Sequence, residues 1–486
     1  MLRRSIASVL ASQPIRYFQS DFPNQNKFRQ VLHLGFMIKD LTQGSPAKLI
    51  ILFTIPLLIG NLFQQFYNIA DTFIVGRTIG MNALAAVGCT GCLMFLILGY
   101  IVGFTSGTAI ITAQRFGAGD MAGVRRSFAV NLILGAFMAT VLTIIGVMFA
   151  RPLLSLMQTP PEIFEDAYQF ISIIFYGLAT SMLFNVLSNS LRAVGNSQAP
   201  LWFLIISSVL NIILVYCFIC GLKMGVEGAA LATVSAQLVS GLLCLPYILK
   251  RGSVFQLTKK DWQFDSRELW EHLQIGLPMG FQLSIIAIGV VVLQFALNKL
   301  GAVPVAAFTA AQRIDMVAVL PLMSFGITMA TFTAQNYGAR KIGRIRNGVF
   351  QCVVMSVSYS ILIGLILIFY GDSFSEIFIT ANPNAVALSH KYLTVNGSMY
   401  FILSLLFIFR YSLQGLGKNT IPMLTGIIEL VMRIFAALIL TRYWGYLGAC
   451  IANPLAWFGA CVPLVVAFII SIRQLTNDAA FQIKND

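Results

Sequence analysis

The chain has 486 residues, of which 58% are hydrophobic and only 10% are charged, and its formal net charge is +14. A soluble protein carries roughly 25% charged residues, so this composition excludes an ordinary soluble domain. Apolar runs of about 20 residues recur from end to end, and each is long enough to cross a bilayer. The sequence predicts an all-α polytopic membrane protein that sits in a lipid bilayer and binds no nucleic acid.

The first residues give two alternatives to a simple tail. They contain Arg3, Arg4 and Arg16 and no acid up to Ser20, a pattern similar to an organelle-targeting peptide. We favour two simpler interpretations. Either residues 1–46 form a cytoplasmic N-terminal tail, or translation begins at Met37.

Apolar runs between polar or turn-rich breaks predict twelve transmembrane helices. In chain order they are expected near residues 48–75, 84–112, 127–150, 164–190, 199–220, 227–249, 270–299, 304–335, 348–370, 385–414, 420–441 and 446–472. The pattern divides the chain into an N-terminal six-helix lobe (47–250), a cytoplasmic linker (251–269), a C-terminal six-helix lobe (270–473) and a cytoplasmic tail (474–486).

Basic residues predict the orientation of the spans. Lys and Arg concentrate in the N-terminal tail and in the loops near 115–126, 250–267 and 340–346. The loops on the other side hold only scattered single charges: Arg77, Arg151, Lys223, Lys299 and Arg442. Positive charge is retained on the cytoplasmic side of a membrane. Both termini are therefore expected to be cytoplasmic, in a plasma (inner) membrane.

The chain repeats itself at an offset of about 221 residues. The matched segments are Ile111–Phe128 with Thr331–Phe350, Ser190–Pro200 with Ser412–Pro422, Gly225–Ala232 with Gly445–Ala452, and Pro56 with Pro278. Each half holds an even number of spans, so both halves enter the membrane in the same direction. Parallel repeats of this kind are related by a pseudo-two-fold axis along the membrane normal, and they build transporters whose lobes rock against each other.

Three stretches carry a family resemblance. "PLLIGNLFQQFYNIADTFIVGRTIGMNALAAVG" (Pro56–Gly88), the paired "TAQRFGAGD" and "TAQNYGAR", and "LRAVGNSQAP" resemble the multidrug and toxic compound extrusion (MATE) family, from about Met37 to Arg473. The resemblance implies a secondary antiporter that exports amphipathic, often cationic drugs or metabolites in exchange for protons or sodium ions. Alternating access of the two lobes would move the substrate, and we expect a monomer.

The first span carries a polar stripe. Its members are spaced three, four and three residues apart and share one helix face: Asn61, Gln64, Asn68 and Asp71. Tyr67 borders the stripe, and the opposite face is Leu, Ile and Phe. A charged side chain inside a span costs about 2.5 kcal/mol or more and marks a functional site. Asp71 is the predicted ion-coupling residue, and the resemblance supports this role. The alternative is a structural acid that pairs with Arg77 or caps a neighbouring helix.

The fifth span offers an amide rather than a second acid. Several family members carry an acid four residues after the position of Asn211, but this chain has Val215 there. We therefore expect Asp71 to work with amides and hydroxyls, and we place Asn185, Asn189 and Asn211 in the substrate cavity with Tyr67 and the stripe. Each amide could instead form an interhelical hydrogen bond, worth about 0.6 kcal/mol in membranes.

The C-terminal lobe lacks one acid that the resemblance would suggest. Sodium-coupled members often carry a Glu in the seventh span, but Met279–Val290 contains no acid and only Gln282 as an amide. This absence favours protons over sodium. In the eighth span, Gln312 and Asp315 are further cavity candidates, with Arg313 beside the acid.

The eleventh span carries Glu429 and Arg433, four residues apart in the order that favours a helical ion pair. We interpret them mainly as a structural charge pair, and a gating or substrate role is the alternative.

Lipid-linked oligosaccharide exporters or lipid flippases of related topology are the alternative function for the whole protein. They tend to carry basic residues in a central cavity, whereas the charges in these spans are mixed.

The sequence predicts no enzyme, no cofactor and no metal site. It has three histidines and no metal-ligand spacing. The C-x-x-C pairs Cys89/Cys92 and Cys217/Cys220 lie in apolar segments, and we interpret them as small buried hydrophobes. With no nucleotide-binding domain in the sequence, the expected energy source is a gradient of H+ or Na+.

Overall fold

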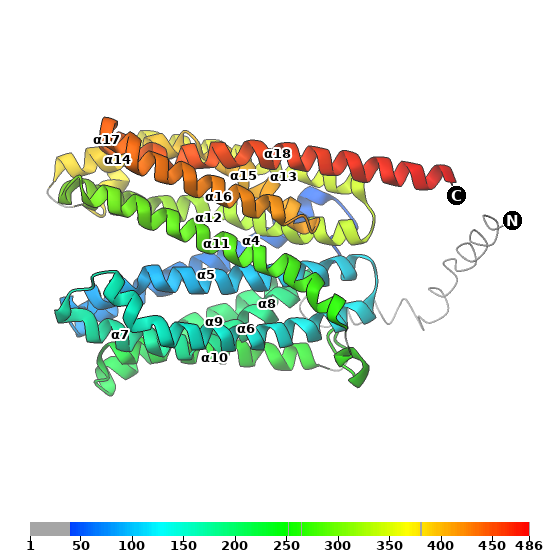
Figure 1. Cartoon of the computed structure of the whole chain (residues 1–486), viewed down its shortest axis with the longest axis horizontal. Helices are drawn as coiled ribbons and strands as arrows, with labels where there is room; N and C mark the ends of the chain where they lie inside the picture. Colours follow the sequence, from blue (N-terminus) through cyan, green and yellow to red (C-terminus); the bar gives the residue numbers. More distant parts are fainter. Residues whose placement is uncertain (1–38, 251, 264, 380–381, 486) are drawn as a thin grey trace. The chain divides into compact units, whose positions relative to one another are not determined.

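The structure of the protein is a computed structural model that describes residues 39–250, 252–263, 265–379 and 382–485, with side chains up to residue 477 (Figure 1). The residues from Asp40 onward form one compact unit. The possible targeting peptide, the alternative start at Met37 and His33 all lie outside the described residues.

The described residues contain ten helices that are long and apolar enough to cross a membrane. The count is twelve when two bent helix pairs are each taken as one span, so the predicted all-α architecture is confirmed. The bent pairs are α7 (Pro161–Tyr176) with α8 (Leu178–Ala193), at 45°, and α14 (Pro383–Gly397) with α15 (Tyr400–Gly415), at 49°. The others are α4 (Pro46–Thr78), α5 (Met81–Gly117), α6 (Met121–Leu156), α9 (Gln198–Tyr216) continued by η1 (Cys217–Gly221), α10 (Gly225–Leu249), α11 (Ser266–Asn298), α12 (Ala302–Gly338), α13 (Ile342–Glu376), α16 (Thr420–Phe435) continued by η3 (Ala436–Leu440) and α17 (Thr441–Trp444), and α18 (Tyr446–Asn485).

Several helices run further than the apolar pattern predicts. α5 ends at Gly117 and α12 at Gly338, although the spans were expected to end near residues 112 and 335. α11 begins at Ser266, inside the stretch predicted as a linker, because the Asp265 side chain accepts a 2.9 Å hydrogen bond from the backbone N–H of Glu268. Caps and turns set helix ends, and hydropathy does not detect them.

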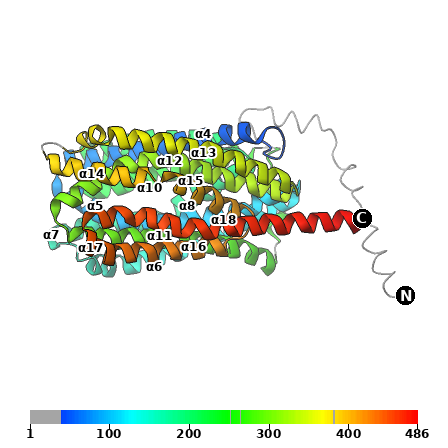
Figure 2. The same ribbon diagram turned by 90° about the horizontal axis from the view of Figure 1, so that it is seen from above.

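The helices gather into two groups. α5 to α10 lie in one group and α12 to α18 in the other, while α4 and α11 pass between them (Figure 1). α4 packs against α9 of the first group and α12 of the second, and α11 packs against α5 and α16. Seen from above, α4 and α11 lie toward opposite edges (Figure 2). The first helix of each repeat therefore contacts both lobes.

An ion pair, supported by hydrogen bonds within the linker, fixes the linker between the lobes to α6. In the short helix η2 (Lys259–Trp262), Asp261 accepts hydrogen bonds from the backbone and the hydroxyl of Thr258, and it lies 3.4 Å from Arg125 of α6. Burial raises the pKa of Asp261, but the Thr258 hydrogen bonds and the Arg125 guanidinium outweigh burial and hold the pKa below its ordinary value. Asp261 is therefore ionised at neutral pH and fixes the linker on α6.

The expectation that the C-x-x-C cysteines are buried is wrong for three of the four. Cys92, Cys217 and Cys220 are exposed, and of the four only Cys89 is partly buried. Apolar residues of the same helices are exposed as well, with Phe95 52% and Tyr216 62% accessible, as expected for a helix that can face lipid. Hydropathy alone cannot separate a lipid-facing residue from a buried one, because both environments are apolar.

Replacing Asp120 with Ala is expected to destabilise the protein by about 1 kcal/mol, the usual cost of losing a helix N-cap. The Asp120 side chain accepts a 2.8 Å hydrogen bond from the backbone N–H of Gly123 at the start of α6. Thermal unfolding of the purified protein in detergent measures the loss. Asp120→Asn keeps an acceptor and should unfold close to wild type. Unfolding of Asp120→Ala at the wild-type temperature would show that the cap contributes nothing.

Candidate functional site

The two halves of the repeat touch at the ends of α5 and α12. A Cβ atom added to Gly117 would lie 1.9 Å from the backbone oxygen of Gln335, and one added to Gly338 would lie 1.8 Å from that of Gln114. Only residues without a side chain allow two helices to approach this closely. We call the contact formed by these four residues the glycine seam. It closes one end of the interface between the lobes.

Two hydrogen bonds reinforce the glycine seam. The side-chain amide of Gln114 donates to the carbonyl of Gly415 at 2.9 Å, and that of Gln335 donates to the carbonyl of Ala193 at 2.7 Å. Gln114 and Gln335 match in the repeat, as do Ala193 and Gly415. Each bond therefore runs from one lobe to the other, and the pair obeys the pseudo-two-fold relation.

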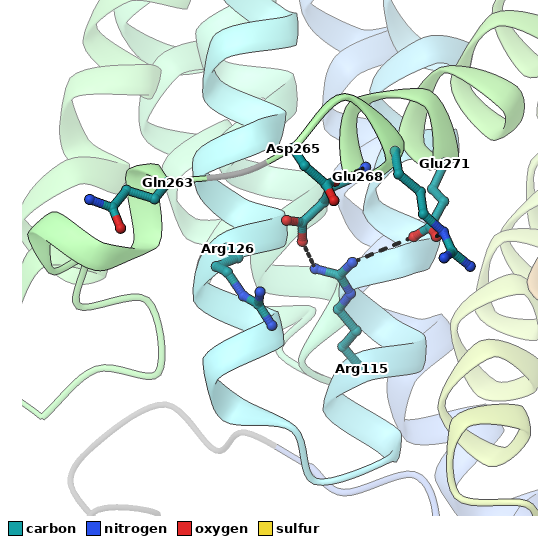
Figure 3. Close-up of a pocket in the computed structure, with 7 residues that line it drawn as sticks. Arg115, Arg126, Gln263, Asp265, Glu268 and Glu271 are labelled. Carbon is teal, nitrogen blue, oxygen red and sulfur yellow. Dashed lines mark hydrogen bonds and ion pairs between the residues drawn. The ribbon is translucent and has the colours of Figure 1, made fainter.

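A polar pocket of about 330 Å³ lies where α11 meets α5 (Figure 3). Arg115 of α5 forms an ion pair with Glu268 of α11 and lies 3.7 Å from Glu271. The pocket is lined by Arg115, Arg126, Gln263, Asp265, Arg267, Glu268 and Glu271. These contacts attach the first helix of the C-terminal lobe to the N-terminal lobe.

His272 extends this attachment into the protein. It lies at the very edge of the predicted span 270–299, yet it is fully buried. One ring nitrogen lies 2.8 Å from the hydroxyl of Ser127 in α6, and the other lies 2.8 Å from the backbone oxygen of Glu268. Ser127 in turn lies 2.8 Å from the hydroxyl of Thr112 in α5. A hydrogen-bonded chain therefore joins α11, α6 and α5.

Asp71 lies within the N-terminal lobe and faces Asn211 of α9. With the amide nitrogen of Asn211 turned toward the carboxylate, that nitrogen donates to Oδ1 of Asp71 at 2.7 Å and lies 3.2 Å from Oδ2. The other amide atom of Asn211 lies 3.5 Å from the hydroxyl of Thr233 in α10. The carboxylate is partly buried and has no ion pair in the described part of the chain, so Arg77 does not neutralise it. Such a group can accept and release a proton.

A small cavity lies beside this pair. Its volume is about 10 Å³, close to the space that one water molecule needs. It is lined by Tyr67, Leu204, Ser207, Ser208, Asn211, Thr233, Ala236 and Gln237. Tyr67 therefore shares an environment with Asn211, and hydroxyl and amide groups surround the approach to Asp71.

The rest of the stripe divides between different surroundings. Asn61 donates to the Ser324 hydroxyl of α12 at 3.3 Å, so it faces the other lobe. Gln64 is partly buried and Asn68 is exposed. The opposite face of α4 is apolar and exposed, with Phe66 65% and Phe73 66% accessible, as expected for contact with lipid.

The two asparagines of α8 do not bond to Asp71. Asn185 donates to the backbone oxygen of Ser181 in its own helix at 2.8 Å. Asn189 donates to the Thr105 hydroxyl at 3.0 Å and accepts from Arg192 at 3.2 Å. Their contacts are those of helix packing. Val215, which occupies the place of a second acid, is fully buried in an apolar cluster.

The acid of the C-terminal lobe has its own partners. Asp315 of α12 accepts a 2.5 Å hydrogen bond from the hydroxyl of the buried Tyr400 in α15. Arg313 is exposed and forms no ion pair with Asp315 in the described residues. Gln312 is partly buried. Asp71 and Asp315 therefore belong to separate polar groups, one in each lobe.

Gln282 lies at the junction of three helices. It is buried in α11, donates to the carbonyl of Pro422 at 2.9 Å and accepts from Gln414 of α15 at 2.8 Å. It therefore holds α11 to its own lobe on the side away from α5.

The predicted charge pair in α16 has a third member. Arg433 Nη2 lies 3.7 Å from Glu429 Oε2, and Glu429 also pairs with Arg410 of α15. The spacing rule identifies Arg433, but it cannot identify a partner on another helix. Likewise the repeat marks Gln114 and Gln335 as equivalent without indicating that their segments touch.

The comparisons with known proteins agree with this architecture. The MatE family model matches residues 56–217 and 278–439, one match in each half of the repeat. "Probable multidrug resistance protein YpnP" of Bacillus subtilis is 28% identical over 358 residues, 73% of this chain and 79% of that protein. "Probable multidrug resistance protein YoeA" of the same organism is 26% identical and covers 88% of this chain and 94% of its own length.

A solved outward-facing MATE family transporter has the same fold. It superposes with a TM-score of 0.84 at 24% sequence identity, over 90% of this chain and 98% of that one. Members of this family are membrane transporters rather than enzymes. The family match in both halves, the twelve spans and the fold lead to one conclusion: this chain belongs to the MATE family of multidrug efflux transporters.

Proposed function

We propose that this protein exports amphipathic, often cationic drugs or metabolites in exchange for protons, by alternating access of its two lobes. The observation that carries the proposal is the Asp71 carboxylate, held by Asn211 inside the N-terminal lobe with no basic partner in the described residues. An acid in this setting binds a proton from one side of the membrane and releases it when its surroundings change.

The closed end of the interface fits the outward-open half of such a cycle. The glycine seam and the Gln114 and Gln335 bonds join the lobes at the ends of α5 and α12. The basic loops support a cytoplasmic position for this end and for both termini, in a plasma (inner) membrane. Export then requires the seam to open for substrate to enter and to close again before release.

We favour protons over sodium as the coupling ion. Asp71 supplies one carboxylate to the polar group that it forms with Asn211, and the place of a second acid is taken by the apolar Val215. With its amide nitrogen turned toward Asp71, Asn211 offers the carboxylate an N–H donor at 2.7 Å, whereas a sodium ion needs several oxygen ligands.

Ethidium transport in everted membrane vesicles tests the coupling. A pH gradient and a sodium gradient are imposed separately, and vesicles without the protein provide the background. We expect the pH gradient alone to drive ethidium accumulation and the sodium gradient to add nothing. Accumulation driven by sodium alone would contradict proton coupling while leaving export itself intact.

A further inference from the structure

The C-terminal lobe buries more positive charge than it neutralises. Arg410, Glu429 and Arg433 are 4%, 2% and 5% exposed. Both arginines form their ion pairs with Glu429, and neither pairs with another acid in the described residues. We call this cluster of two arginines and one glutamate the arginine triad. Its formal charge inside the helix bundle is therefore +1. Uncompensated charge is costly in an apolar interior.

The arginine triad also has unused donors. The Nε–H groups of Arg410 and Arg433 are buried, and neither has a hydrogen-bond partner among the residues that the structure describes. Nη1 of Arg433 reaches only the backbone oxygen of Ile286, at a long 3.4 Å. Buried polar groups are almost always hydrogen-bonded, so each exception requires an explanation. One bound anion would supply both the balancing charge and the hydrogen-bond acceptors.

The position of the triad suits a transported molecule. Glu429 and Arg433 lie nine and thirteen residues after the start of α16 at Thr420. At ~1.5 Å per residue this is about 14 and 20 Å along the helix, near the middle of a hydrocarbon core about 30 Å thick. Transport sites lie near this depth.

A single helix separates Arg433 from the other lobe. Gly289 of α11 lies against the guanidinium, because a Cβ atom added there would be 3.1 Å from Cδ and 3.3 Å from Nη1 of Arg433. α11 is the helix that packs on α5 of the N-terminal lobe. A shift of α11 as the lobes move would therefore uncover Arg433 first.

We propose that the arginine triad binds the anionic group, carboxylate or phosphate, of an amphipathic substrate. The inference rests on the proposed export function and names a substrate class for it. A singly charged anion brings the triad to neutrality, and guanidinium groups bind carboxylate and phosphate oxygens through paired N–H donors. Glu429 then holds the two arginines together while leaving their Nε–H groups for the ligand.

Binding of simple anions to the purified protein tests the site. The protein is placed in phosphatidylcholine nanodiscs, and benzoate and inorganic phosphate are titrated separately by calorimetry without any ion gradient. We expect saturable binding to wild type, binding weakened about tenfold or more by Arg433→Met, and tighter binding in Glu429→Gln. Arg151→Met, which removes a surface arginine paired with Glu165, is the matched control and should bind as wild type.

The outcomes separate the possible failures. Absence of saturable binding by either anion to wild type overturns the proposal, and so does unchanged affinity in Arg433→Met. If Arg433→Met does not fold, the decision falls to Arg433→Lys, which keeps the charge but loses the paired donors and should still bind more weakly. Competition by phosphatidylglycerol in the nanodisc would support the site and identify a lipid head group as its ligand. Because no gradient is used, a failure of proton coupling leaves this result unaffected.

Discussion

Asp71→Asn is expected to reduce ethidium transport driven by a pH gradient by about tenfold or more, because the amide cannot carry the proton that an intramembrane acid carries. The substitution keeps the size of the side chain and its contact with Asn211. Exchange of labelled for unlabelled ethidium without a gradient should therefore remain. Loss of the driven rate with retained exchange is the signature of a coupling residue, since a merely structural acid would affect both.

Glu162→Gln is the matched control for Asp71→Asn. Glu162 lies in the first turn of α7, is exposed and forms no ion pair in the described residues. Removing its charge should leave the driven rate unchanged. Normal pH-driven transport by Asp71→Asn would contradict the proposed role of α4. Asp315 and Glu429 would then be the candidates for the ion-coupling residue.

Gly117→Ala and Gly338→Ala are each expected to reduce transport by a similar factor through a different mechanism. A methyl group at either position overlaps a backbone oxygen of the opposite lobe at less than 2 Å, at Gln335 or Gln114. Overpacking of this kind costs about 1–3 kcal/mol, and here the lobes can relieve it by staying apart. The closed state of the seam is then disfavoured, and the cycle stops before release.

Gly343→Ala separates the seam from a general effect on helices. Gly343 lies near the start of α13, and a Cβ atom there has nothing within 4 Å. This variant should transport as wild type, and size-exclusion profiles of all three variants check folding. Wild-type transport by Gly117→Ala would show that the lobes do not need to meet at this point.

Local patterns account for what the sequence predicts correctly. The spacing of Asn61, Gln64, Asn68 and Asp71 depends only on the period of one helix, and the twelve spans depend only on long apolar runs. The family match confirms the resemblance carried by Pro56–Gly88 and the TAQ segments. Such features require no knowledge of which helices are neighbours.

Contacts between distant segments could not be predicted in the same way. Arg410 and Glu429 lie on different helices, so the four-residue rule favours Arg433 alone. His272 follows polar residues at the edge of the predicted span, yet α11 extends through it and its buried ring contacts Ser127 of α6. The apolar pattern also gives the same signal for exposed and buried cysteines. In each case the missing information is the packing of one helix on another.

Proton movement measured together with dye movement tests the central claim most directly. The protein is reconstituted in proteoliposomes containing a pH-sensitive dye, and ethidium is added on one side without any imposed proton or sodium gradient. We predict that ethidium crosses the membrane with protons moving in the opposite direction, and that Asp71→Asn removes the proton signal. Ethidium transport by wild type with no accompanying proton movement would contradict proton-coupled antiport.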